Sequence, residues 1–542
     1  MSLLKRKSRF LFLLLIIFPG LFYMSVSCQE SEFDVIIRNG SVIDGTGGPA
    51  LQADLGIKGG RISEIGNLET RTATRIIDAG GLTVAPGFID LHTHAERKIL
   101  EFPSVENYIR QGVTTIVGGN CGGSPYPIGD FLEKVEETGI ALNLTLLVGH
   151  NTVRREVMGR ENRYATAEEL QEMQSLVQKA MQDGAFGMST GLKYIPGAYS
   201  NTEEVVALSK VVSKHGGFYA THMREEGIGL LDAVEEALNI GRQAGLPVHI
   251  SHHKAVGKSM WGSSVKTLKM VDEAVEDGMD VTVDQYPYTA TSTGLTVLFP
   301  AWSLEGGEEK IKKRLEDATL RARIKEGIVH NILYDRGGGD PATIVISSYP
   351  SDSALEGKNL AEITKMRGNE PTPENAAETL MDLYHAGGGR GIYHCLVEED
   401  VVRIMKHPFV MHASDGATIE FGKAKPHPRS YGTYPRVLGR YVREQKVLSL
   451  EEAVRKMTSL PAKRLGLKDR GVLKKGMWAD IVIFDSQKVI DRATWTEPHQ
   501  YPEGIPFVLV NGLVVIDESN RTGEFPGKVL HGAASEQTIS EK

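Results

Sequence analysis

Short apolar segments that end in polar or glycine-rich sequence recur through the middle of this 542-residue chain. Helix-like amphipathic stretches, such as 167–183 and 230–244, separate most of them. Strands that alternate with helices indicate an α/β fold, and eight such units are typical of a (β/α)8 barrel, whose chemistry lies at the carboxyl ends of the strands. The eight candidate strands are 87–92, 114–119, 143–149, 184–189, 217–221, 247–251, 280–284 and 408–413.

Both ends of the chain have a different texture from the middle. Short β-branched runs broken by glycine fill 33–85, and similar runs return at 476–485 and 505–512. Two β-rich ends around a different middle indicate one discontinuous sheet domain. We therefore expect a small β-sandwich domain from 29–86 plus 460–525, a catalytic barrel over 87–459, and a tail over 526–542.

One interval between candidate strands is too long for a crossover helix. The stretch from 284 to 408 holds glycine clusters, a strand-like run at 343–347 and helix-forming residues. Because apolar residues continue through it, a disordered linker is disfavoured. We expect an insertion subdomain at about 290–405, between strands 7 and 8, near the mouth of the site.

The amino terminus has the pattern of an export signal. A basic stretch at 5–9 precedes an apolar run at 10–18, which is shorter than the roughly 18 apolar residues that a spanning helix needs. We interpret 1–28 as a signal peptide. Cys28 also resembles a bacterial lipoprotein junction, although Ser25 replaces the usual branched apolar residue. Ordinary cleavage and lipidation both stay open, and we expect an exported protein that is periplasmic or membrane-anchored.

Charge and cysteine content narrow the function further. A net charge of −8 and a pI near 6.1 supply no basic field for nucleic acid. The three cysteines are Cys28, Cys121 and Cys395, so the fold does not depend on a disulfide framework. At least one cysteine is therefore free to do chemistry.

The first candidate strand ends in His92 and His94. Alternation along a strand puts both imidazoles on one face, where they can converge on one ion. The alternative is that both histidines are solvated or core residues without a metal-binding role. An H-x-H pair at the carboxyl end of a strand favours a metal site.

Other strand ends carry further metal-binding side chains. Imidazole, thiolate and carboxylate form the ligand set that zinc prefers. Taken alone, Cys121 would be a core cysteine and Asp415 a turn residue, but glycines around Cys121 allow close backbone approach. The set comprises His92 and His94, Cys121 on the second strand, His222 on the fifth, His252 or His253 on the sixth, and Asp415 on the eighth.

Seven motifs lie at or near these strand ends: Ala85-Pro-Gly-Phe-Ile-Asp-Leu-His-Thr-His94, Gly119-Asn-Cys-Gly122, Ser189-Thr-Gly-Leu-Lys-Tyr194, Thr221-His-Met-Arg-Glu225, Ile250-Ser-His-His-Lys254, Asp284-Gln-Tyr-Pro-Tyr288 and His412-Ala-Ser-Asp-Gly416. With them the sequence, from 33 to about 526, resembles the amidohydrolase superfamily and, within it, the N-acyl-D-amino-acid deacylases or D-aminoacylases. Many relatives bridge two metals with a carboxylated lysine from the fourth strand, whereas the D-aminoacylase branch uses a cysteine from the second. This chain has Cys121 there and no lysine at the end of the fourth strand.

The resemblance implies a metal-dependent hydrolase barrel with one tightly bound zinc and a second, weaker one. The tighter ion would lie between Cys121, His222 and His252, with His253 as the alternative, and the weaker site would use His92, His94 and the shared Cys121. Zinc makes a water molecule more acidic, and Asp415 would take its proton and pass it to the leaving amine. The products are a carboxylate and a free D-amino acid.

A substrate with an α-carboxylate needs a cation in the site. Arg429 can bind a carboxylate through two hydrogen bonds, and Lys254 offers a point charge beside the metal histidines. The resemblance adds Tyr194 to this substrate-binding group. A specialist for charged substrates would need a further cation, which the sequence does not assign.

Three functions are weighed. The first is a zinc N-acyl-D-amino-acid deacylase acting on a small-molecule substrate. The second is another amidohydrolase, either a cyclic-amide hydrolase, which the absent bridging lysine disfavours, or a metallodipeptidase. The third is a non-catalytic binding lipoprotein, whose signature would be a lost ligand, and no ligand is lost here. Substrate chirality, the preferred side chain and the oligomeric state are not read from the sequence.

Overall fold

The computed structural model describes residues 31–535. The signal-peptide prediction for 1–28, including Cys28, lies outside the described residues. None of the helices within 31–535 combines the length and apolar content needed to cross a membrane.

A row of parallel strands forms the centre of the molecule. Every one of the eight candidate segments overlaps a strand of this row, which confirms the α/β prediction, and segment 143–149 contains two short ones. Consecutive strands pair except between β8 and β9, and a parallel bridge between Thr93 and Gly416 links the last strand back to the first. The row is β6 (Phe88–Asp90), β7 (Val113–Gly118), β8 (Asn143–Leu146), β9 (Val148–Gly149), β10 (Gly187–Gly191), β11 (Phe218–His222), β12 (Val248–Ile250), β13 (Val281–Gln285) and β17 (Val410–His412).

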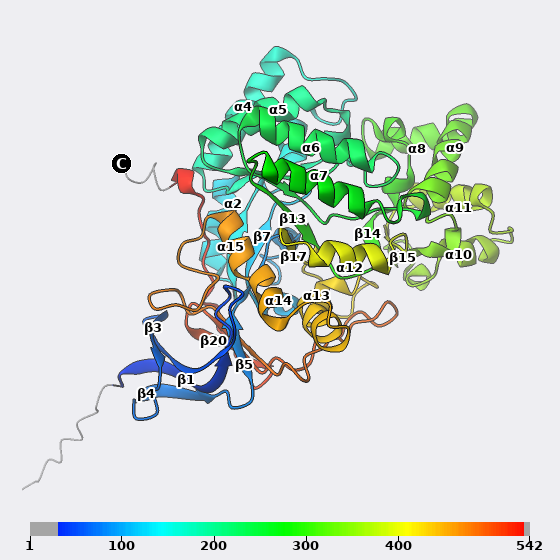
Figure 1. Ribbon diagram of the computed structural model, residues 1–542. Helices are drawn as coiled ribbons and strands as arrows, with labels where there is room; N and C mark the ends of the chain where they lie inside the picture. Colours follow the sequence, from blue (N-terminus) through cyan, green and yellow to red (C-terminus); the bar gives the residue numbers. More distant parts are fainter. Residues whose placement is uncertain (1–30, 536–542) are drawn as a thin grey trace, which may run out of the picture.

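Amphipathic helices cover the outside of this row (Figure 1). The helix α4 shows why the sequence forms them: Thr166 and Glu169 make a capping box at its start, and Met173, Val177 and Ala180 form its buried face. The buried faces join the core built from the strands. The helices that follow or flank the strands are α2 (Ile128–Thr138), α3 (His150–Met158), α4 (Ala167–Gln182), α5 (Thr202–Lys214), α6 (Leu230–Ala244), α7 (Ser264–Glu276), α12 (Glu398–Lys406), α14 (Leu450–Met457) and α15 (Ser459–Leu465).

Both ends of the described chain contribute to one nine-stranded sheet, seen beside the parallel row in Figure 1. The junction is the antiparallel pairing of β5 with β18, because β5 belongs to the first part of the chain and β18 to the last. The sheet comprises β1 (Phe33–Val42), β2 (Leu51–Lys58), β3 (Arg61–Gly66), β4 (Ala73–Asp78), β5 (Thr83–Pro86), β18 (Ile481–Phe484), β19 (Phe507–Val510), β20 (Leu513–Asp517) and β21 (Asn520–Arg521).

A buried polar cluster joins this sheet to the parallel row. Asp480 accepts hydrogen bonds from the backbone of Asn511 at 2.7 Å and from the side chain of Asn143 at 3.2 Å, and it pairs with Arg470. The segment after 526, expected as a tail, runs along β8 through 530 with backbone hydrogen bonds to Ile140 and Leu144.

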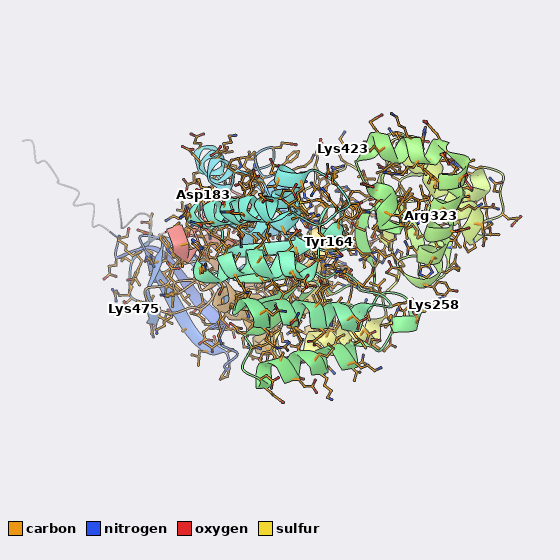
Figure 2. The ribbon with its side chains drawn as sticks, turned by 90° about the horizontal axis from the view of Figure 1, so that it is seen from above. Tyr164, Asp183, Lys258, Arg323, Lys423 and Lys475 are labelled. Carbon is orange, nitrogen blue, oxygen red and sulfur yellow. The ribbon has the colours of Figure 1, made fainter. Side chains whose placement is uncertain are left out.

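The long interval between β13 and β17 forms a lobe with its own apolar core. Its helices lie at the end of the molecule opposite the nine-stranded sheet, as the positions of Arg323 on α9 and Lys475 show (Figure 2). The helix α12 lies outside this lobe and packs against α7 and β17, within the layer that covers the parallel row. The lobe contains β14 (Thr291–Gly294), α8 (Glu308–Glu316), α9 (Ala318–Tyr334), β15 (Ile344–Ser348), α10 (Leu360–Met366), α11 (Pro373–His385) and β16 (Arg390–Tyr393), and the β strands pair in the order β14-β16-β15.

Candidate metal centre and substrate cavity

The structure brings the six predicted strand-end residues together at one end of the parallel row. His222 is the last residue of β11, and the others lie within four residues of the carboxyl ends of their strands. His92, His94 and Cys121 form one group of potential metal ligands, Cys121, His222 and His252 a second, and His92, His252 and Asp415 a third; within each, the ligand atoms lie within 4.8 Å of one another.

The Cys121 thiol lies at the centre of this cluster. Its Sγ is 3.3 Å from His92 Nε2, 3.5 Å from His252 Nε2 and 3.7 Å from His222 Nδ1. Burial by itself would raise the pKa of the thiol, but the charges of His92 and His252 outweigh it and hold the pKa well below its usual value. These surroundings favour the thiolate, which is the form that binds a metal.

Asp415 contacts both histidines of the first strand end and Arg429. Its Oδ1 is 3.2 Å from His94 Nε2 and 3.6 Å from His92 Nε2, and its Oδ2 is 2.9 Å from Arg429 Nη1. Burial would raise the pKa of this carboxyl, but the Arg429 and His92 charges hold it well below its usual range. The carboxylate is thus ionised beside the predicted ligands.

The backbone is strained where the cluster forms. Cys121, His252 and Asp415 have φ values of +52°, +36° and +48°, which side-chain-bearing residues rarely adopt. Such conformations cost about 1–3 kcal/mol each and concentrate at functional sites. The strain turns each side chain toward the common centre at the end of its strand.

The end of β10 explains why the fourth strand supplies no ligand. A Cβ on Gly191 would lie 2.3 Å from the Cys121 carbonyl oxygen, and one on Gly122 would lie 2.1 Å from Asn151 Oδ1. The Cys121 loop therefore packs directly on the β10 backbone. A lysine side chain has no room at Gly191, and the thiol occupies the centre instead.

Asp284, at the end of β13, orients two of the candidate ligands. Its Oδ2 accepts hydrogen bonds from His249 Nε2 at 2.7 Å and His92 Nδ1 at 3.2 Å, and its Oδ1 accepts from the backbone N–H of His252 at 2.7 Å. Directing Nδ1–H of His92 to a carboxylate leaves Nε2 free to face Cys121. Asp284 stood in a quoted motif, but sequence reasoning gave it no role.

Glu226 forms a second orienting group that sequence reasoning missed. Its carboxylate is 3.2 Å from His252 Nδ1 and 3.5 Å from His222 Nε2, and it forms ion pairs with Lys254 and Arg336. The signal for Glu226 was its position four residues after His222. Arg336 comes from the lobe, more than a hundred residues along the chain, and no sequence pattern points to it.

The two adjacent histidines have different surroundings. His252 faces the thiol and His222, with its Nε2 2.7 Å from His222 Nδ1. His253 points to α7, where its Nε2 is 2.7 Å from the Thr267 hydroxyl oxygen. Of the pair, only His252 lies in the cluster.

A cavity of about 580 Å³ opens over the cluster, and the three predicted substrate-binding residues line it. The Tyr194 ring lies 4.6 Å from the His222 ring, and its hydroxyl oxygen accepts a hydrogen bond from Thr293. Lys254 is buried, so it is not a solvated surface charge, and its Nζ is 2.8 Å from His252 Nδ1. Arg429 lies over the Tyr286 ring and donates through Nη2 to the Ser292 carbonyl.

These donors fit zinc. A thiolate surrounded by three imidazoles matches the sulfur and nitrogen ligands of tetrahedral zinc sites. The Nε2 of His222 has no hydrogen-bond partner within residues 31–535, and the ring directs Nδ1 to the thiol. Carboxylates orient the other two imidazoles, as is usual for metal-binding histidines.

Comparisons with known proteins agree with this geometry. The model of the amidohydrolase family matches residues 75–324 and 368–516. A D-aminoacylase from Alcaligenes xylosoxydans xylosoxydans is 38% identical over 530 residues, covering 94% of this chain and 99% of that protein.

Solved structures give the same match. An N-acyl-D-glutamate deacylase from Bordetella bronchiseptica, in complex with zinc and a phosphonate inhibitor that mimics the tetrahedral intermediate, is 36% identical with a TM-score of 0.79, over 92% of this chain and 99% of that one. A D-aminoacylase whose binuclear metal centre shows one-metal activation and second-metal attenuation is 37% identical with a TM-score of 0.79, over 92% and 100%.

Removing ligands one at a time tests whether they are equivalent. We expect His222→Asn and Cys121→Ser to retain roughly tenfold less zinc after dialysis than His92→Asn, since both imidazoles of the site that they disrupt are buried, whereas His94 of the other site is partly exposed. Zinc per chain, measured by atomic emission, checks this. His253→Asn is the matched control, because its side chain faces Thr267. Equal zinc loss in His92→Asn and His222→Asn would contradict two unequal sites.

Proposed function

We propose, because this chain belongs to the amidohydrolase family, that it is a hydrolase of the linear amide bond in N-acyl-D-amino acids, releasing a carboxylate and a free D-amino acid. The observation that carries the proposal is the convergence of Cys121, four histidines and ionised Asp415 beneath a cavity that also holds Arg429. The full-length similarity to D-aminoacylase and to N-acyl-D-glutamate deacylase supports the same reaction.

We infer that the parallel row is a closed (β/α)8 barrel. The bridge from Thr93 to Gly416 and the continuity of β8 with β9 support closure. The nine-stranded sheet is then the small β domain built from both ends of the chain, and the lobe is the insertion subdomain. The functional residues lie where such a barrel places them, at the carboxyl ends of its strands.

For the metal, we infer one tightly bound zinc between Cys121, His222 and His252, and a weaker second site formed by His92, His94 and the shared Cys121. Each set lies within the span that one ion requires. Zinc, when bound, supplies Lewis acidity that polarises a carbonyl group and makes water more nucleophilic. Asp284 and Glu226 hold the imidazoles in the orientations this requires.

Asp415 is the residue that moves the proton. Its carboxylate is ionised, so it can accept a proton from the attacking water and give it to the leaving amine nitrogen. The Arg429 charge keeps the carboxylate from protonating in the free enzyme. The Asp415 carboxylate contacts His94 and His92. A proton acceptor in this position lies beside the candidate metal ligands, where the substrate carbonyl must bind.

The substrate α-carboxylate binds to Arg429, with Lys254 and Tyr194 contributing to the same wall of the cavity. Arg429 Nη1 is buried without a conventional hydrogen bond within the described chain, although it forms an ion pair with Asp415. Lys254 is already engaged by Glu226 and His252. Arg429 therefore has the greater capacity for a new anion, and a guanidinium suits a carboxylate geometrically.

A steady-state assay of zinc-loaded mature protein on paired D- and L-N-acetyl amino acids tests the proposal. We expect hydrolysis with a clear preference for the D series. Asp415→Asn is the control: it should retain zinc and lose about 10²–10⁴-fold in kcat, the usual contribution of a general acid-base residue. Preference for L substrates, or for hydantoins or dipeptides, would overturn the assignment, and absence of amide hydrolysis would favour a binding protein.

We also infer that the protein is exported, and that it is either cleaved as an ordinary secreted protein or held at a membrane by a lipid on Cys28. The basic and apolar order of residues 1–18, followed by Ser25 and Ser27 before Cys28, supports export. In cells fed a radioactive fatty acid, a lipidated wild type is labelled and Cys28→Ala is not. An unlabelled wild-type protein would show that the signal is cleaved without lipidation.

A further inference from the structure

The cavity over the metal cluster is cationic in a protein whose net charge is −8. Its lining contains two carboxylates, Asp415 and Glu420. A concentration of one sign of charge in an enclosed cleft focuses the electrostatic potential and selects ligands of the opposite sign. The positively charged residues in the lining are Arg97, Lys98, Arg155, Lys254, Arg336, Arg390, Lys423 and Arg429.

Most of these cations have an anionic partner within the protein. Glu226 pairs with Lys254 and Arg336, and Asp415 pairs with Arg429. The two cations that follow the first strand also form ion pairs: Arg97 with Glu96 at 3.7 Å and Lys98 with Glu101 at 3.5 Å.

The remaining three cations make no ion pair with residues 31–535. Arg155 donates a hydrogen bond to the Thr152 hydroxyl, and Lys423 lies on an exposed loop. Arg390 has neither an ion pair nor a side-chain hydrogen bond in that range, and its side chain is exposed where it lines the cavity. An accessible guanidinium without a partner can bind a carboxylate through two hydrogen bonds.

Arg390 is held in a defined position. It is the first residue of β16, and its backbone is opposite Gly294 of β14 and Ser348 of β15. The same small sheet supplies Ser292, Thr293 and Ser347 to the cavity lining. Because the sheet fixes the backbone on both sides, the point from which the Arg390 side chain enters the cavity is fixed.

We propose that the enzyme selects N-acyl-D-amino acids whose side chain carries a second carboxylate, and that Arg390 binds this carboxylate. The inference rests on the proposed function, because it presupposes that Arg429 binds the α-carboxylate beside the metal cluster. Arg429 is engaged there with Asp415, so it is not available for a second anion, whereas Arg390 carries a charge without a partner. Arg390 thus supplies the further cation that an acidic substrate requires.

Kinetics on matched substrates test the proposal. The zinc-loaded wild type should have a kcat/KM for N-acetyl-D-glutamate well above that for the isosteric N-acetyl-D-glutamine. Arg390→Met should lower kcat/KM for the glutamate substrate about 10- to 100-fold while changing that for the glutamine substrate little, since only the charged pair is lost. Arg429→Ala should lower kcat/KM for both substrates, since both carry the α-carboxylate.

Two further variants control for charge and folding. Arg323→Met makes the same change in the same lobe, but Arg323 lies on α9 over the Trp302 ring, outside the cavity, and it should leave the preference intact (Figure 2). Arg390→Lys keeps the positive charge and should retain part of the preference for glutamate. Thermal denaturation of each variant shows whether it folds like the wild type.

The outcomes separate this inference from the proposed function. A wild type that hydrolyses neutral N-acetyl-D-amino acids without preferring acidic ones would overturn the inference and leave the function intact. Inactivity on every N-acyl-D-amino acid would remove both. A parallel loss of glutamate and glutamine hydrolysis in Arg390→Met would exclude the side-chain role. A greater loss with N-succinyl-D-leucine than with N-acetyl-D-glutamate would assign the bound carboxylate to the acyl group instead.

Discussion

The contact of one thiolate with three imidazoles determines the rest of this site. Cys121 can reach His92, His222 and His252 only because its loop adopts a positive φ and packs on the bare backbone of Gly191. The strands that end here therefore bring their carboxyl ends to a small common centre. A negative thiolate buried at that centre is stabilised by the positive side chains around it and by the metal that we infer there.

Two carboxylates keep this charged centre ordered. Asp284 fixes His92 and the backbone of His252, and Glu226 holds His252 while it neutralises Lys254 and Arg336. Because Arg336 comes from the lobe, the same carboxylate ties the lobe to the metal cluster. The lobe therefore helps to position the candidate ligands and also forms part of the wall of the cavity.

The sequence predicted the parts of the structure that depend on local pattern. The positions of His92, Cys121, His222 and Asp415 at strand ends could be predicted, because each apolar run is followed directly by polar or glycine-rich residues. Glu226 with Arg336, and the unpaired Arg390, were not visible. Their roles depend on how the lobe folds back over the parallel row, and contacts between residues far apart in the chain leave no periodic signal. The family resemblance already favoured His252 over His253, and the structure brings His252 to the thiol and turns His253 toward Thr267.

Zinc K-edge X-ray absorption on the zinc-loaded protein tests most directly whether Cys121 is the shared metal ligand. The account predicts a sulfur neighbour at about 2.3 Å together with imidazole nitrogens at about 2.0–2.1 Å, and loss of the sulfur contribution in Cys121→Ser. A spectrum with only nitrogen and oxygen neighbours, unchanged in Cys121→Ser, would contradict it.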